Sequence, residues 1–291
     1  MITLVTVLLL LFSIACMFRL AFLIPAMLLV GFLADPLRKL VEGEPVYFVV
    51  FVGVAVLSAF IGLFFRNGLS IFEALTRWSP KVRLPLTLFM VLIFIQAMNS
   101  FIGYGSLILT GIGAMSYTAP FLAMVVGYFV FDRNERIQQL IKAYLICGAL
   151  LVAAVCLSFL GLDWAVLKEV GAGLVIYDQG TIVYSHSGFM RSSEIAAWHM
   201  ATAVCFLIIL NVTNRSRLTI PASVVFGLIL FVGVVLTGRR KMIMQIVRFC
   251  GLYGVLYFYF KRSLSLLIML LLAFSIFALW LGIELLFPGG Y

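Results

Sequence analysis

The sequence predicts an all-α, polytopic integral membrane protein with about ten transmembrane helices in one membrane domain, residues 1–291. Of its 291 residues, 65% are hydrophobic and only 11% are charged. The mean hydropathy of +1.22 is higher than a soluble domain requires. Its apolar runs are continuous over about 15 to 25 residues and do not alternate, which favours helices over the strands of a β-barrel.

Continuous apolar runs define the expected helices in chain order. We expect them at residues 2–18, 20–34, 46–65, 84–98, 106–130, 138–160, 191–212, 220–237, 241–260 and 263–286. The first is interpreted as a membrane segment and not as a removed signal peptide, because a basic n-region and a cleavage site are both missing. Arg19 and Pro25 interrupt the first two segments. This pair therefore forms either a hairpin or one bent span with a re-entrant piece.

The charges of the connections predict the orientation. Residues 66–83 contain four basic side chains and one acidic side chain, which places this connection in the cytoplasm by the positive-inside rule. Three further basic connections then fall on the same side, with Arg133 and Arg136, Arg215 and Arg217, and Lys261 and Arg262. The outer side receives residues 35–45, residues 99–105 and a long external loop at about 161–190.

One basic connection, Gly238-Arg239-Arg240-Lys241, departs from this rule because alternation of the spans places it outside. We interpret its three adjacent positive charges as a binding site for an anion, and guanidinium groups suit the diphosphate of a lipid carrier. The alternative is a topology shifted by one span, in which the cluster is an ordinary cytoplasmic anchor. The net charge of +9 fits basic residues at membrane edges better than a nucleic-acid partner.

A second polar group opens the helix that follows the external loop. Arg191, Glu194, Trp198 and His199 lie roughly along one side of it, and ionisable groups at a membrane edge predict a functional site. Arg191 is either an interfacial arginine or an anion ligand. Glu194 either neutralises it or accepts a proton from a hydroxyl. His199 is either a structural histidine or a catalytic one, and His186 in the loop is the more accessible candidate base.

Other chemistries have little support in the sequence. The two histidines and scattered acids lack metal-ligand spacing, and the motifs of phosphate loops, nucleophile elbows and zinc proteases are missing, so no metal or cofactor is expected. The cysteines lie in apolar runs without a C-x-x-C pair, which predicts buried packing and not disulfides. They are Cys16, Cys147, Cys156, Cys205 and Cys250.

The motif G-F-M-R-S-S-E-I-A-A-W-H, which begins at Gly188, is followed further along by L-T-G-R-R-K-M, which begins at Leu236. Together they resemble the O-antigen ligase and polymerase superfamily, in the variant seen in exopolysaccharide polymerase-like members. The chain departs from many members in having Tyr184, Ser185 and His186 where they carry an arginine. It also ends at residues 288–291, about where members continue into a large external loop with a functional histidine. The resemblance therefore predicts a shortened or partial form.

The resemblance implies a metal-independent glycosyltransferase in the cell (inner) membrane, with multiple spans. Such an enzyme polymerises or ligates polyprenyl-diphosphate-linked saccharides on the extracytoplasmic face during surface polysaccharide biosynthesis. We predict diphosphate binding by Arg191, Arg239, Arg240 and Lys241, and a catalytic group of Arg191, Glu194, His186 and His199. The expected partners are the carrier-linked saccharide, membrane lipids and other polysaccharide-assembly proteins, without a nucleic acid. The alternative function is a non-enzymatic transporter or export subunit for the polysaccharide or its lipid carrier.

Overall fold

The computed structural model describes residues 2–42, 50–68, 83–131, 134–168, 175–178, 181–213, 219–261 and 275. The chain divides into two compact units. The first contains Met1–Ala34 and Pro45–Ile137, and the second contains Asp35–Glu44 and Gln138–Tyr291. Each unit is described below by itself.

The first unit is built from helices that meet around small side chains. Its elements are α1 (Ile2–Ala15), η1 (Leu20–Phe22), the first part of α2 (Leu23–Leu40), α3 (Val50–Asn67), α5 (Arg83–Tyr104) and α6 (Leu107–Val130). Helix α3 packs against both α1 and α6, with Ala55 and Ala59 fully buried. A Cβ added at Gly62 would lie 2.0 Å from the carbonyl oxygen of Met17. Small residues therefore allow the close backbone approach that membrane helices use.

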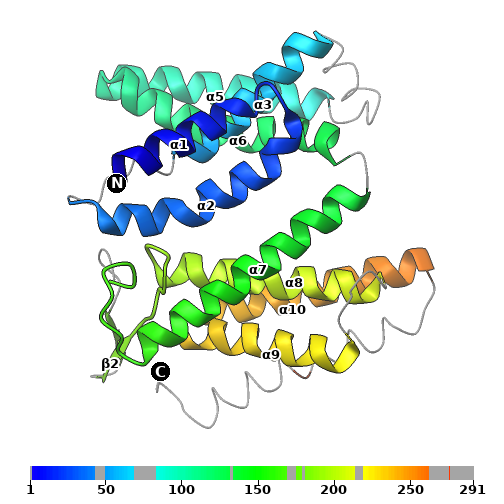
Figure 1. The fold of residues 1–291 in the computed structure, drawn as a ribbon. Helices are drawn as coiled ribbons and strands as arrows, with labels where there is room; N and C mark the ends of the chain where they lie inside the picture. Colours follow the sequence, from blue (N-terminus) through cyan, green and yellow to red (C-terminus); the bar gives the residue numbers. More distant parts are fainter. Residues whose placement is uncertain are drawn as a thin grey trace. The chain divides into compact units, whose positions relative to one another are not determined.

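The second unit is a bundle of helices. It contains most of α7 (Asn134–Phe159), together with α8 (Ser193–Val212), α9 (Ile220–Leu236) and α10 (Arg240–Lys261). Helices α8, α9 and α10 lie side by side (Figure 1). A Cβ added at Gly148 would lie 2.9 Å from the Cβ of Ala203, and one at Gly233 would lie 2.7 Å from Met200 Sδ. The small residues at these positions therefore allow α7 and α9 to pack closely against α8.

A small antiparallel hairpin precedes α8, and the other regular elements among the described residues are helices. Strand β1 (Val175–Asp178) pairs with β2 (Thr181–Tyr184), with Val175 opposite Tyr184 and Asp178 opposite Thr181. The hairpin lies in the segment predicted to be an external loop. Its β-branched and aromatic residues suit paired strands, and an external segment has no need to be helical.

Among the residues that the structure describes, five helices are long and apolar enough to cross a membrane, which confirms the predicted class of membrane protein. They are Leu84–Tyr104, Leu109–Val130, Asn134–Phe159, Ser193–Val212 and Lys241–Tyr259. Three shorter apolar helices are Leu4–Ala15, Phe51–Asn67 and Ile220–Leu236. The count of about ten spans stays a prediction, and the span expected at 263–286 lies outside the described residues except for residue 275.

Two helices end later than predicted. The loop expected at residues 35–45 is helical as far as Leu40, because α2 continues through Pro36. The turn expected at 99–105 is also helical as far as Tyr104. The helix ends only before Gly105, whose φ is +61°, a conformation that glycine adopts without strain. Polar side chains at these positions are compatible with a helix. The prediction, which was based on polarity alone, therefore placed the helix ends too early.

The prediction of buried cysteines is confirmed for three of the five. All five cysteines are free thiols; Cys16, Cys205 and Cys250 are buried, and Cys147 and Cys156 are half-buried.

Candidate functional site

The segment that leads into α8 crosses α7 at close range. Gly188 has a φ of +54°, and a Cβ there would lie 2.9 Å from the backbone nitrogen of Val155. Glycine is therefore the residue that fits both the conformation and the space. On either side of it, Ser187 and Met190 are buried. Ser192 then takes an extended conformation and its Oγ accepts a hydrogen bond from the Ile195 N–H at 3.3 Å, which caps the helix.

Two buried charges on α2 hold this segment in place. Lys39, only 8% exposed, donates from Nζ to the Gly188 carbonyl oxygen at 2.7 Å and to Ser187 Oγ at 3.4 Å. Asp35, 6% exposed, accepts a hydrogen bond at Oδ2 from the backbone N–H of Arg191 at 3.1 Å. Burying such charges is unfavourable unless hydrogen bonds compensate. The contacts of α2 thus fix both ends of the turn before α8.

The basic motif reaches the same place from the other side of the bundle. Thr237 ends α9, and its Oγ1 donates to the Val234 carbonyl oxygen at 2.6 Å. Gly238 follows with a φ of +70°, the left-handed conformation common after a helix end. Helix α10 then begins at Arg240. This sharp turn directs Arg239 and Lys241 toward the start of α8.

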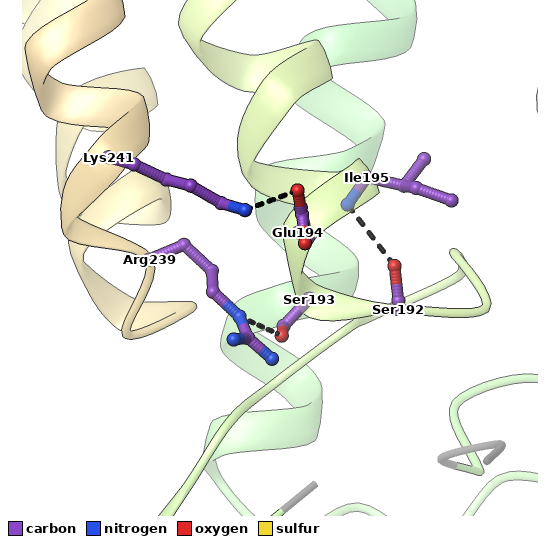
Figure 2. A network of polar contacts seen from close by, with 6 residues as sticks. All are labelled: Ser192, Ser193, Glu194, Ile195, Arg239 and Lys241. Carbon is purple, nitrogen blue, oxygen red and sulfur yellow. Dashed lines mark hydrogen bonds and ion pairs between the residues drawn. The ribbon is translucent and has the colours of Figure 1, made fainter. Parts of the chain in front are cut away.

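The two motifs meet in a small polar cluster (Figure 2). Arg239 donates from Nε to Ser193 Oγ at 2.8 Å. Lys241 forms an ion pair with Glu194, with its Nζ 2.5 Å from Oε1. The side chains of this pair are 60% and 49% exposed. We call Ser193, Glu194, Arg239 and Lys241 the polar cluster. Because the ion pair is exposed, its partners are easily separated and remain accessible to a ligand.

Arg191 lies next to the polar cluster and is half-buried. Its backbone N–H is held by Asp35. Within the part of the chain that the structure describes, its guanidinium makes no hydrogen bond or ion pair, so it is available to an anion. Arg240 is the first residue of α10, but its side chain lies outside the description.

The two histidines each bond a side chain of α7. The Nδ1 of His186 lies 3.3 Å from Ser158 Oγ, and the imidazole packs edge-on against Phe159. Burial lowers the pKa of His186 below its ordinary value of 6.5, so the ring is neutral at pH 7 and able to accept a proton. The Nδ1 of His199 lies 2.6 Å from the hydroxyl oxygen of Tyr144. Six residues along α8 separate His199 from Ser193, about 9 Å of helix axis. This arrangement favours the structural interpretation of His199.

Asp35 and Lys39 were not predicted as site residues, because residues 35–45 were interpreted as an external loop. Their one signal in the sequence is a pair of opposite charges spaced i, i+4 directly after an apolar run. The donors gathered at the site are guanidinium, ammonium and hydroxyl groups, which are suited to an anion. Among the described residues, no group of three or more His, Cys, Asp or Glu side chains is arranged to hold a metal ion.

Comparisons of the chain with models of known protein families, with curated proteins and with solved structures found no match.

Proposed function

We propose that the protein is a glycosyltransferase of the cell membrane, with about ten spans, that transfers saccharide from a polyprenyl-diphosphate carrier to an acceptor hydroxyl on the extracytoplasmic face. Its role would be the polymerisation or ligation of a surface polysaccharide, in company with other assembly proteins. One observation carries this proposal. The basic turn between α9 and α10 contacts the first turn of α8 through Arg239 with Ser193 and Lys241 with Glu194, at the ends of apolar helices.

Anion binding is the chemistry that this arrangement supports best. Arg239 and Lys241 carry fixed positive charge to the N-terminus of α8, and Arg191 lies two residues before Ser193. Helix N-termini favour negative charge because their first N–H groups lack helical partners. A diphosphate offers several oxygen acceptors, and arginine binds such oxygens in pairs. Positive groups held at this position would stabilise the charge that develops on a departing diphosphate.

Side chains of the protein would suffice to catalyse the transfer at the sugar. The acceptor hydroxyl oxygen attacks the anomeric carbon and forms the new C–O bond. The C–O bond to the diphosphate breaks, and its electron pair leaves on the diphosphate. The acceptor proton passes to a base, for which Glu194 and His186 are the candidates. If the diphosphate takes Lys241 as its partner, the Glu194 carboxylate is released from the ion pair and becomes able to accept that proton.

The test is binding and transfer by the purified full-length protein in lipid nanodiscs. The ligand is a polyprenyl diphosphate that carries a single hexose. We compare wild type with Arg191→Ala and Arg239→Ala, and use Arg19→Ala, an exposed arginine of the first unit, as the matched control. A charge-assisted bond contributes about 1.5–3 kcal/mol, so each site variant should bind roughly 10- to 100-fold more weakly. The control should bind like wild type.

The outcomes separate the alternatives. Unchanged affinity in both site variants, with melting temperatures like that of wild type, would refute the shared diphosphate site. Binding without transfer, accompanied by movement of the carrier-linked saccharide across the membrane of sealed vesicles, would support the function of an export subunit. It would refute the function of a glycosyltransferase.

A further inference from the structure

Polar side chains continue beyond the polar cluster along the neighbouring surfaces of α8 and α10. On α8, Trp198 and Thr202 follow Glu194 at intervals of four residues. On α10, Gln245 and Arg248 follow Lys241 at intervals of four and three residues. Such spacings place side chains on one side of a helix. We call Trp198, Thr202, Gln245 and Arg248 the polar face.

A hydrogen bond joins the two helices within this polar face. Gln245 donates from Nε2 to Thr202 Oγ1 at 3.4 Å, and Thr202 in turn donates to the Trp198 carbonyl oxygen at 2.8 Å. Thr202 lies eight residues past Glu194, about 12 Å along the helix axis. The hydrocarbon core of a bilayer is about 30 Å thick. The polar cluster and the polar face together therefore extend over about 40% of a membrane crossing.

The polar face is open in the structure. Trp198 is 47% exposed, Arg248 is exposed, and Thr202 and Gln245 are half-buried. All four lie in helices that are long and apolar enough to span a bilayer. Helix α9 provides the contrast, because its exposed side chains include Val224, Leu228 and Val232. The surface of α9 suits lipid, whereas an amide, a hydroxyl and a guanidinium in contact with lipid tails would be strongly unfavourable.

We propose that the polar face lines a water-filled vestibule that descends from the polar cluster into the membrane and binds the saccharide of the substrate. Charged and polar groups at membrane depth are found where they face water or a polar ligand. The Trp198 ring offers an apolar surface to the C–H groups of a sugar. Thr202 and Gln245 offer donors and acceptors to its hydroxyls. The identity of the ligand rests on the proposed function, whereas the existence of the vestibule does not.

The vestibule is tested by the reactivity of introduced cysteines in intact membranes. The five native cysteines are replaced by alanine, and Thr202→Cys and Gln245→Cys are compared with Leu228→Cys on α9. A charged, membrane-impermeant methanethiosulfonate reagent reacts with thiolates in water, and a thiol surrounded by lipid is protonated and inaccessible. We expect Thr202→Cys and Gln245→Cys to react at least about tenfold faster than Leu228→Cys. Equal, slow rates at all three positions would overturn the vestibule.

A second measurement keeps the native cysteines. The fluorescence contribution of Trp198 is the difference between wild type and Trp198→Phe. Acrylamide, which is soluble in water, should quench this contribution more strongly than lipids with brominated tails. Stronger quenching by the brominated tails would place Trp198 in lipid and overturn the vestibule, even if the cysteine variants fail to fold.

The saccharide assignment has its own test. The two cysteine variants of the polar face are labelled in the presence of hexose-bearing polyprenyl diphosphate or of polyprenyl diphosphate alone. We expect the hexose-bearing carrier to slow the labelling by about tenfold and the bare carrier to leave it unchanged, since only the former places hydroxyls beside the polar face. Equal effects of the two carriers, or none, would overturn the saccharide assignment. The binding assay on Arg191→Ala and Arg239→Ala reports separately on the proposed function.

Discussion

Replacing Lys39 by methionine should loosen the turn that leads into α8. Methionine keeps much of the side-chain volume but removes the ammonium, so the Gly188 carbonyl oxygen loses its donor at 2.7 Å. A hydrogen bond to a charged group contributes about 1.5–3 kcal/mol, and the long contact to Ser187 adds little. Removing a buried charge returns part of its desolvation cost. The net weakening of the turn is therefore about 1–3 kcal/mol.

Amide hydrogen exchange measures this loss where it occurs. Two amides report on the turn, since the Met190 N–H donates to the Ser187 carbonyl oxygen and the Arg191 N–H donates to Asp35. A local weakening of about 1–3 kcal/mol should speed their exchange roughly 5- to 150-fold. Lys168→Met, which removes an exposed lysine of the same unit, is the matched control and should leave both amides unchanged. Wild-type exchange at both amides in Lys39→Met would refute the anchoring role of Lys39.

Two further predictions concern the same segment. Gly188→Ala should lower the melting temperature more than Gly161→Ala: both glycines are left-handed, at a strain of about 1–2 kcal/mol for alanine, but only at position 188 does the added Cβ meet backbone. Equal melting temperatures would contradict the close approach to α7. Since burial lowers the folded-state pKa of His186 below the unfolded value of 6.5, the neutral ring contributes stability that is full above about pH 6.5 and is lost as the pH falls through the folded-state pKa. Melting temperatures measured from pH 7.5 to pH 5 should therefore fall more steeply in wild type than in His186→Gln, and parallel curves would exclude His186 as the titrating group.

Apolar length was sufficient to predict most of the helices. Helix α8 (Ser193–Val212) begins two residues after its predicted start, and α9 (Ile220–Leu236) ends one residue before its predicted end. This accuracy arises because apolar side chains fill a span continuously and polar capping residues end it. The ends were misplaced where polar residues continue a helix, as in α2 and α5. In α2, the contacts that hold Asp35 and Lys39 come from the distant segment before α8.

The two motifs of the candidate site were predicted, but the residues that hold them in place were not. Glu194 lies at the start of α8, and Arg239 follows the end of α9. Alternation of the spans places these two positions on the same side of the membrane, so their proximity could be predicted. The contacts of Lys39 with Gly188, 149 residues away, follow from tertiary packing that no local pattern encodes. The partner of His199 was similarly hidden, because Tyr144 is an ordinary aromatic residue of an apolar helix.

The short turn at Gly238 couples the basic motif mechanically to its two helices. Only Thr237, Gly238 and Arg239 lie between α9 and α10. Arg239 and Lys241 therefore follow any change in tilt of this helix pair and have little freedom of their own. A bilayer changes the tilt of helices when its hydrocarbon thickness does not match their apolar length. Membranes of graded thickness thus offer a way to vary the separation of Arg239 and Ser193 without altering a single residue.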